Sequence, residues 1–357
     1  MLPVNKLARK LLKWHKNFGR HDLPWQKMVN PYRVWVSEIM LQQTQVKTVI
    51  PYYQRFMQHF PDLQSLSAAP IDDVLHLWSG LGYYARGRNL HKAARIIFAE
   101  HAGKFPVDID TLITLPGIGR STAGAILALS HEQRHPILDG NVKRVLTRYH
   151  GIIGWPGDKA IEDKLWLIAE TETPKTNIAD YTQAIMDLGA TVCDRNRPAC
   201  QSCPLAVDCY ANTHNLHSEL PGRKKKKALP IKQTIFAIIE NKQGEVLLQK
   251  RPPTGIWGGL WSLPECPIDA DIPAWLNNLF GSKVSGLTAL PSLRHTFSHF
   301  HLDIHPYRAR LRTNDFGIRD DDTICWYKPD KNNRLGMAAP VKKLLMELSA
   351  HIAGANE

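Results

Sequence analysis

The stretch Leu115-Pro116-Gly117-Ile118-Gly119-Arg120-Ser121-Thr122-Ala123-Gly124-Ala125-Ile126 decides how the first half of the chain folds. A proline and two closely spaced glycines break a helical pattern into a tight turn, and the small residues after it restart a helix. Backbone N–H groups in such a turn, together with the N-terminus of the new helix, can hold a phosphate. We therefore predict a phosphate-binding hairpin between two helices, contributed by Leu115, Gly117 and Gly119.

Two other interpretations of the hairpin compete with this one. A dinucleotide-binding fingerprint is disfavoured, because Thr122 stands where the third glycine should be and residues 108–114 are capped like a short helix rather than a buried strand. A simple connection between two helices stays open.

A lone carboxylate follows the hairpin by about twenty residues, in the run Ile137-Leu138-Asp139-Gly140-Asn141-Val142-Lys143-Arg144. An apolar pair precedes Asp139 and a helical pattern follows it, so we expect it at the start of a helix. Taken alone, an aspartate in this place is more often an N-cap than a catalyst.

Composition favours a protein that binds a polyanion. The 357 residues carry a formal net charge of +12, with 43% hydrophobic and 22% charged residues, which is ordinary for a soluble chain of two domains. Residues 1–20 are amphipathic and lack an uninterrupted apolar core, so we expect neither a signal peptide nor a membrane anchor. The expectation is a cytoplasmic, nucleoid-associated protein of bacterial type.

Four of the six cysteines fall close together, at Cys193, Cys200, Cys203 and Cys209. In a chain without a secretion signal, such clustering favours metal binding over disulfides. Four thiolates suit either zinc or an iron–sulfur cluster, and only Cys200 and Cys203 have the spacing of a zinc knuckle.

The pattern along the chain predicts two domains of different class. Residues 1–217 read as successive helices, including 34–50, 70–78, 84–101, 158–171 and 177–190, so this domain is predicted to be all-α. Residues 218–230 read as a basic linker, either solvated or touching a phosphate backbone. Residues 231–357 are predicted to be α+β, with strands at 231–240, 245–250, 302–311 and 323–327 and helices at 271–280 and 337–351.

The hairpin, Asp139 and the cysteine spacing together resemble the helix–hairpin–helix DNA glycosylases over residues 1–215, and the cysteine spacing is similar to the 4Fe–4S loop of their endonuclease III-like branch. A closer resemblance, to the adenine-specific branch, is carried by Trp35-Val36-Ser37-Glu38-Ile39-Met40-Leu41-Gln42-Gln43-Thr44-Gln45, Gly80-Leu81-Gly82-Tyr83-Tyr84-Ala85-Arg86 and His295-Thr296-Phe297-Ser298-His299. It implies removal of adenine opposite 8-oxoguanine or G from double-stranded DNA by a monomeric enzyme, after the base has been flipped out.

Removal of adenine requires an acid and an anion. The acid protonates adenine, which leaves well only when protonated, and the anion stabilises the positive charge that the sugar then develops. Glu38 lies in an apolar segment, so desolvation in a pocket would keep it protonated; a surface carboxylate is the alternative. Asp139 at a helix N-terminus is expected to stay ionised and to stabilise the cation. The resemblance further implies that Asp139 bonds transiently to C1′.

The resemblance also assigns supporting roles. Tyr83, Ser121 and Asn141 would orient the flipped nucleotide, and Gln183 would bind the adenine edge. Gln43 and Tyr83 would wedge the duplex and Thr44 would approach the opposite base, although the Gln-Gln-Thr-Gln run also reads as an ordinary polar helix face. The predicted phosphate contacts are Arg86, Lys143, Arg195 and Arg197. Bifunctional relatives carry a lysine where Ser121 stands, so the imine route to strand cleavage is closed.

The second domain resembles a Nudix-like fold, from Gly255-Ile256-Trp257-Gly258-Gly259 onward. The carboxylates that a Nudix box needs for divalent metal are missing from residues 272–279, so pyrophosphate hydrolysis is excluded. We predict that Phe297, Ser298 and His299 read the damaged base; a purely structural appendage is the alternative. For the whole chain, the alternatives are a bifunctional pyrimidine glycosylase and a DNA-binding protein without catalysis.

Overall fold

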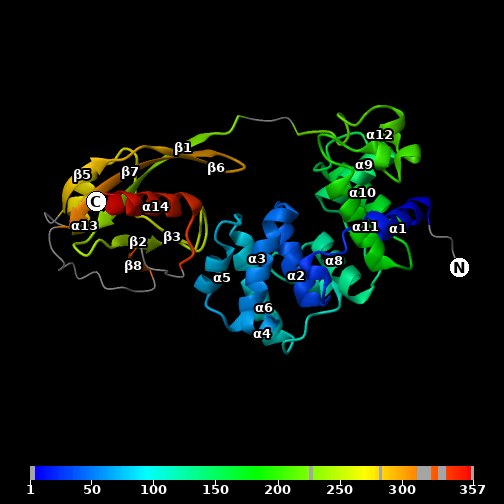
Figure 1. The fold of residues 1–357 in the computed structure, drawn as a ribbon, viewed down its shortest axis with the longest axis horizontal. Coiled ribbons are helices and arrows are strands. Elements are labelled where there is room, and N and C mark those ends of the chain that lie inside the picture. Colours follow the sequence, from blue (N-terminus) through cyan, green and yellow to red (C-terminus); the bar gives the residue numbers. More distant parts are fainter. Residues whose placement is uncertain (1–4, 225–227, 281–283, 312–322, 329–334, 355–357) are drawn as a thin grey trace. The chain divides into compact units, whose positions relative to one another are not determined.

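The computed structural model describes residues 5–224, 228–280, 284–311, 323–328 and 335–354. The chain divides into two compact units, Met1–Ala68 with Asn89–Lys226 and Ala69–Arg88 with Lys227–Glu357 (Figure 1). This division differs from the predicted domains in one segment, residues 69–88, which pack with the C-terminal unit. Of the predicted basic linker, residues 225–227 lie outside the described part of the chain.

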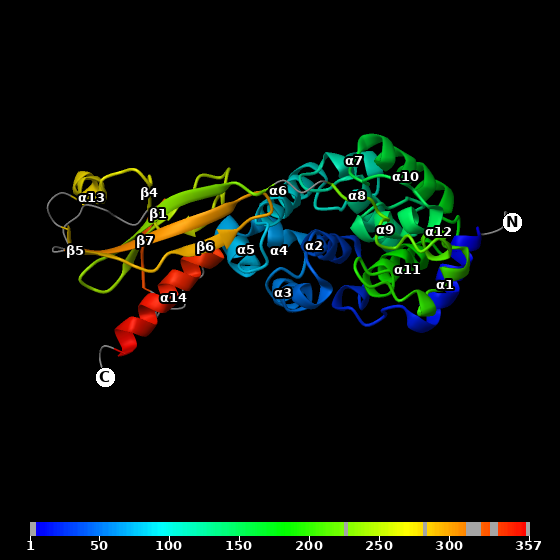
Figure 2. The same ribbon diagram turned by 90° about the horizontal axis from the view of Figure 1, so that it is seen from above.

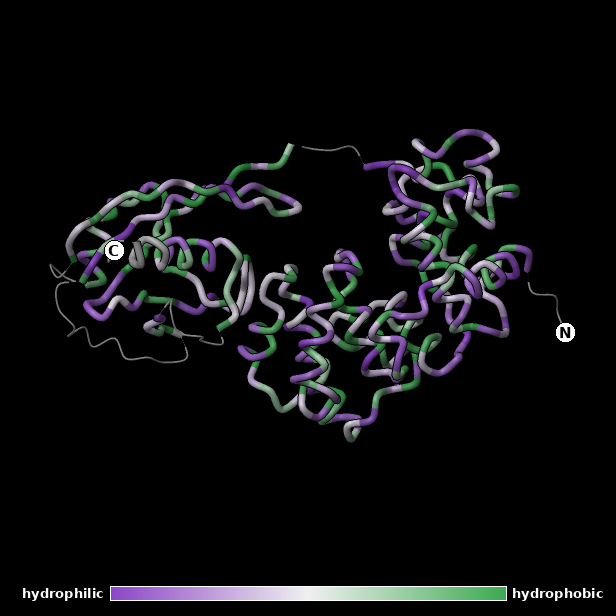
Figure 3. The backbone as a smooth tube through the Cα atoms, viewed as in Figure 1, coloured by the Kyte–Doolittle hydropathy of each residue, from purple (hydrophilic) through white to green (hydrophobic). Residues whose placement is uncertain are grey.

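The first unit is all-α in its described residues, as predicted. Its helices are α1 (Lys6–Phe18), α2 (Pro31–Leu41), α3 (Val46–His59), α4 (Leu63–Ala68), most of α6 (Ala85–Glu100), α7 (Ile109–Thr114), α8 (Arg120–His131), α9 (Gly140–His150), α10 (Lys159–Glu172), α11 (Ile178–Thr191) and α12 (Tyr210–Thr213). Short 3-10 turns lie at Pro24–Gln26, Cys200–Ser202 and Ala206–Asp208. In Figure 3, hydrophobic and hydrophilic residues alternate along these helices, as an amphipathic helix requires.

One core of the first unit joins α1, α9 and α11. Leu7 and Leu11 of α1 are almost fully buried and belong to the same cluster as Val142 and Leu146 of α9 and Leu188 of α11. Each such side chain contributes roughly 1.5–3 kcal/mol by leaving water. This packing fixes α9, and with it Asp139 at its start, against α1 and α11.

The single helix predicted over residues 34–50 is wrong. The chain instead forms α2 and α3, separated by a turn at residues 42–45 in which Gln43 takes a left-handed conformation (φ 56°). Pro51, the residue directly after the predicted helix, lies inside α3. The Gln-Gln-Thr-Gln run is therefore a turn between helices rather than a polar helix face.

The second unit is α+β, as predicted. Its sheet follows the order β3-β2-β1-β7-β5, with β4 paired to β1, β6 to β7 and β8 to β2. The strands are β1 (Ile231–Glu240), β2 (Val246–Lys250), β3 (Trp261–Ser262), β4 (Glu265–Cys266), β5 (Val284–Ala289), β6 (Leu293–Thr296), β7 (His301–Leu311) and β8 (Ile324–Tyr327). The helices of this unit are α5 (Ile71–Trp78), α13 (Ile272–Phe280) and α14 (Ala339–Gly354), and Figure 2 shows β1, β6 and β7 side by side.

The predicted strands and helices of this unit are confirmed to within a few residues at each end. β1 and β7 pair in parallel along their length, whereas β1 and β2 form the predicted antiparallel hairpin around residues 241–245. Alternating side chains of β1 and β7, such as Ile239 and Ala309, pack against Leu276 and Phe280 of α13. No helix in the described part of the chain is both long and apolar enough to span a membrane.

Candidate active site

The hairpin that organises the first unit lies between α7 and α8. Asp108 caps α7 by accepting from the Thr111 N–H, as its sequence predicted. Leu115 and Ile118 are buried and anchor the turn, which the Ile118 N–H closes by donating to the Leu115 carbonyl. Gly117 takes the left-handed conformation (φ 81°), and both Gly117 and Gly119 are exposed. The hairpin thus presents backbone to solvent at the start of α8, as a phosphate site requires.

Asp139 is the N-cap of α9. Its Oδ1 accepts from the Val142 N–H at 2.8 Å, and the Asn141 amide donates to its Oδ2 at 3.3 Å. Ser121, on α8, accepts from the Leu138 N–H at 2.9 Å and so ties the hairpin helix to the residue before Asp139. Asp139 is therefore an N-cap, and this role does not exclude the catalytic one that was predicted for it.

Glu38 has the protonation behaviour predicted for an acid. Burial and, to a smaller extent, the charge on Asp139 raise the pKa of this carboxyl to about 8. The side chain is half-buried on α2, which packs against α8. The surface-carboxylate alternative is thereby disfavoured.

Asp139 departs from its expectation in one respect. Burial raises its pKa, against the hydrogen bonds from Val142 and Asn141 and the charge of Arg144, which all lower it. The helix N-terminus alone does not decide its protonation. Because the charged Asp139 acts on Glu38, Asp139 ionises first, and the two carboxyls still divide into one acid and one anion.

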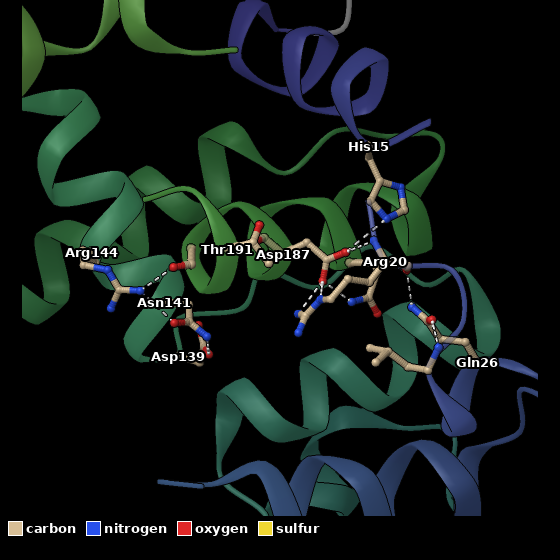
Figure 4. A network of polar contacts seen from close by, with 11 residues as sticks. His15, Arg20, Gln26, Asp139, Asn141, Arg144, Asp187 and Thr191 are labelled. Atoms are coloured by element: carbon tan, nitrogen blue, oxygen red, sulfur yellow. Dashed lines mark hydrogen bonds and ion pairs between the residues drawn. The ribbon is translucent and has the colours of Figure 1, made fainter. Parts of the chain in front are cut away.

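A buried polar network beside the site was missed by the sequence analysis (Figure 4). Asp187 is fully buried and accepts from Nε and Nη2 of Arg20, from the Arg20 N–H and from the Gln183 amide at 2.8 Å. Gln183 is itself buried, so one of its amide protons is fixed toward Asp187. Its predicted contact with adenine stays a prediction. The spacing of four residues between Gln183 and Asp187 on α11 was the available signal.

Arg144 forms the second missed contact in Figure 4. Its guanidinium donates to Asn141 Oδ1 at 2.9 Å, to the Gly189 carbonyl and to the Cys193 carbonyl. Lys143, predicted to contact phosphate, has its Nζ on Glu162 at 2.6 Å. The Glu162 carboxylate therefore compensates the charge of Lys143 in this structure.

The cysteine loop packs against α9. Arg148 is almost fully buried; it donates to Cys193 Sγ at 3.3 Å and to the carbonyls of Asp194 and Arg195, whereas the exposed side chains of Arg195 and Arg197 face solvent. Burial raises the pKa of Cys203 to about 11, with smaller contributions from Cys193, Cys209 and Cys200. Within the described residues, however, no group of three or more His, Cys, Asp or Glu is arranged to hold a metal ion.

Tyr83 and Arg86 belong to the second unit. Tyr83 is half exposed and left-handed (φ 49°), in a turn that also uses Gly80 and Gly82. The assignment of Arg86 to phosphate is corrected: its guanidinium is buried, donates to the Leu81 and Gly82 carbonyls and lies over the Tyr83 ring. Burial lowers the pKa of Arg86 to about 10. Arg86 therefore stabilises the turn by hydrogen bonds to its carbonyls.

Residues 297–299 form the turn between β6 and β7. The Phe297 ring stacks on Phe300 at 4.5 Å between centroids, while Ser298 and His299 are exposed. Gln43 is exposed in its turn in the first unit, and Thr44 is half-buried, with its hydroxyl donating to the Gln42 carbonyl at 3.3 Å. These residues are accessible, as the predicted DNA contacts require.

Comparison with known proteins agrees with this geometry. The family model of the HhH-GPD superfamily base excision DNA repair proteins matches residues 36–171, and a NUDIX domain model matches residues 235–347. A solved non-covalent endonuclease III–DNA complex shares the fold of the helical part, with a TM-score of 0.51 and 22% identity over 61% of this chain and 100% of that chain. The helical part of the chain thus has the fold of the HhH-GPD base excision DNA repair proteins.

Proteins that are similar to this chain along most of its length identify its family. An adenine DNA glycosylase of Buchnera aphidicola subsp. Acyrthosiphon pisum is 42% identical over 96% of this chain and 97% of its own length. The Homo sapiens adenine DNA glycosylase is 34% identical over 86% of this chain and 67% of its own length. The chain belongs to the adenine DNA glycosylase (MutY) family.

Proposed function

We propose that this enzyme acts as a monomer on double-stranded DNA, removes adenine paired with 8-oxoguanine or G, and does not cut the strand. The observation that carries the proposal is the pair of interacting carboxyls, Glu38 and Asp139, whose pKa values are both raised while Asp139 ionises first. A protein that only binds DNA has no use for such a pair, because desolvated carboxylates next to a polyanion weaken binding.

The two carboxyls suit hydrolysis of an N-glycosidic bond. With a pKa of about 8, Glu38 is mostly protonated at neutral pH and can give its proton to adenine. Asp139, held toward the start of α9 by the Val142 N–H, can face the sugar cation that forms as adenine leaves. Gln183, fixed by Asp187, offers an amide edge to adenine.

Among the described residues, the side chains around Asp139 supply no free amine for an imine. Ser121 stands at the start of α8 and uses its Oγ to accept from Leu138, while the Nζ of Lys143 is paired with Glu162. An amine must be uncharged and unpaired to attack C1′. These contacts support a glycosylase without lyase chemistry.

DNA contacts follow from the exposed turns. The hairpin around Gly117 and Gly119 supplies backbone N–H groups for phosphate. Gln43 and Tyr83 are exposed wedges that can replace a flipped base, and the turn at residues 297–299 reads the opposite base.

The test is a single-turnover assay on three duplexes, carrying A opposite 8-oxoguanine, A opposite G, or an oxidised pyrimidine. We expect adenine release from the first two, faster opposite 8-oxoguanine, with strand breaks only after alkali. Release of the oxidised pyrimidine with direct strand cleavage would instead establish the bifunctional pyrimidine enzyme.

We also propose that Cys193, Cys200, Cys203 and Cys209 hold a 4Fe–4S cluster. Four free cysteines of one loop, with the cationic Arg148 donating to Cys193 Sγ, are a donor set suited to iron and sulfide. Bound there, the cluster would order a loop that has few apolar side chains of its own.

Iron analysis of anaerobically purified protein tests the cluster. We expect about four iron and four sulfide per chain, and loss of both in Cys203→Ser. Cys266→Ser, which changes a buried cysteine of the second unit, is the matched control and should keep both. Zinc without sulfide would contradict the assignment.

A further inference from the structure

Within the second unit, the turn at residues 297–299 rests on Trp257. The Trp257 ring is buried and lies 5.3 Å from the Phe297 ring and 5.4 Å from the His295 ring, centroid to centroid. Its backbone is left-handed (φ 53°), which a bulky residue adopts only when its surroundings compensate for the strain. A displacement of Trp257 therefore displaces Phe297.

The backbone after Trp257 is held on its other side by Arg88. The Gly258 carbonyl accepts from Arg88 Nη1 at 2.6 Å, and a Cβ added at Gly259 would lie 3.6 Å from Arg88 Cδ. A Cβ at Gly258 would lie 2.6 Å from the Pro253 carbonyl oxygen, so the turn has little freedom to shift. Arg88 is half-buried, and burial lowers its pKa.

Arg88 lies in the first turns of α6, directly after the Tyr83 loop (residues 79–84). The Arg88 N–H donates to the Tyr84 carbonyl, and the Arg86 N–H donates to the Tyr83 carbonyl. The Ser79 hydroxyl, before Tyr83, and the Tyr84 hydroxyl, directly after it, both donate to the Met337 carbonyl, at 3.2 and 3.1 Å. Within the second unit, the Tyr83 loop is therefore held by Met337 on both sides of Tyr83.

We propose that Arg88 and Trp257 are positioning residues that couple the base-reading turn at residues 297–299 to the Tyr83 loop. The path runs from Phe297 to Trp257, along the backbone to Gly258, through Arg88 and into the Tyr83 loop. Recognition of the base opposite adenine then adjusts the wedge that replaces the flipped base. This inference rests on the proposed function, because it assigns base reading to the turn and wedging to Tyr83.

The experiment is a double-mutant cycle in two backgrounds. The measured quantity is the ratio of single-turnover adenine release rates opposite 8-oxoguanine and opposite G. In the wild-type background, Phe297→Ala and Tyr83→Ala should combine non-additively, by about fivefold or more in that ratio. In the Arg88→Met background, which keeps the apolar stem and removes the donor to Gly258, the two changes should combine additively.

Two further variants separate coupling from general damage. Lys250→Met removes another cation of the same unit, one that pairs with Asp72 rather than with the Trp257 turn, and should leave the non-additivity intact. Trp257→Phe should reduce the non-additivity as Arg88→Met does. It replaces Arg88→Met in the experiment if that variant does not fold. Loss of stability alone lowers both rates together and leaves their ratio unchanged.

The outcomes distinguish this inference from the proposed function. A wild-type enzyme without a preference for 8-oxoguanine, or one whose preference survives Phe297→Ala, overturns the proposed reading role and this coupling with it. A preference that Phe297→Ala abolishes, with unchanged non-additivity in both Arg88→Met and Trp257→Phe, overturns the coupling alone.

Discussion

Asp139→Asn is expected to lower single-turnover release of adenine at least about 10³-fold, with little loss of stability. The amide keeps the shape of the carboxylate and still accepts from the Val142 N–H, so α9 keeps its N-cap. It removes the negative charge that faces the developing sugar cation. Its described neighbours at the start of α9 do not replace that charge, because Asn141 is an amide and Arg144 is a cation.

The comparison variant for this experiment is Asp180→Asn. Asp180 is an exposed acid in the first turn of α11, so its loss changes the net charge of the protein equally without touching the site. Release should stay within about twofold of wild type, as is usual for a surface substitution. Retention of most of the activity in Asp139→Asn, with intact DNA binding in both variants, would show that the anion is not required.

Much of the fold and part of the site could be predicted because their signals are local. The hairpin, the N-cap position of Asp139 and the bounds of β1 and β7 each depend on residues within one turn or one strand. The raised pKa of Glu38 was foreseen for the same reason, since its helical neighbours Ile39 and Met40 are apolar and prove to be buried.

The features that were missed depend on residues far apart in the chain. Arg86 looks like any cation on a helix, and only the packing of its turn shows that it is buried. Asp187 accepts a hydrogen bond from Arg20, and Arg148 donates to the carbonyls of residues 194, 195, 217 and 220. The break between α2 and α3 needs a left-handed glutamine, which has no strong sequence signature.

Glu38→Gln is expected to lower adenine release by about 10²–10⁴-fold and to remove the alkaline limb of its pH profile. In the wild type the acid must be protonated, so release should fall as the pH rises through about 8, the pKa of Glu38. Glutamine can still donate a hydrogen bond but cannot transfer a proton, so its residual rate should not depend on pH in this range. Single-turnover rates from pH 6 to 9.5 on the duplex with A opposite 8-oxoguanine measure both effects.

Stability supplies an independent check on the same carboxyl. Because folding raises the pKa of Glu38 from 4.5 to about 8, its contribution to stability is fully present below pH 4.5 and is lost as the pH rises through 8. The melting temperature of the wild type should therefore fall, relative to that of Glu38→Gln, between pH 5 and 9. Glu100→Gln, at an exposed position at the end of α6, should show neither this difference nor a change in rate. An alkaline limb that persists in Glu38→Gln would assign the proton to another group, since glutamine does not titrate.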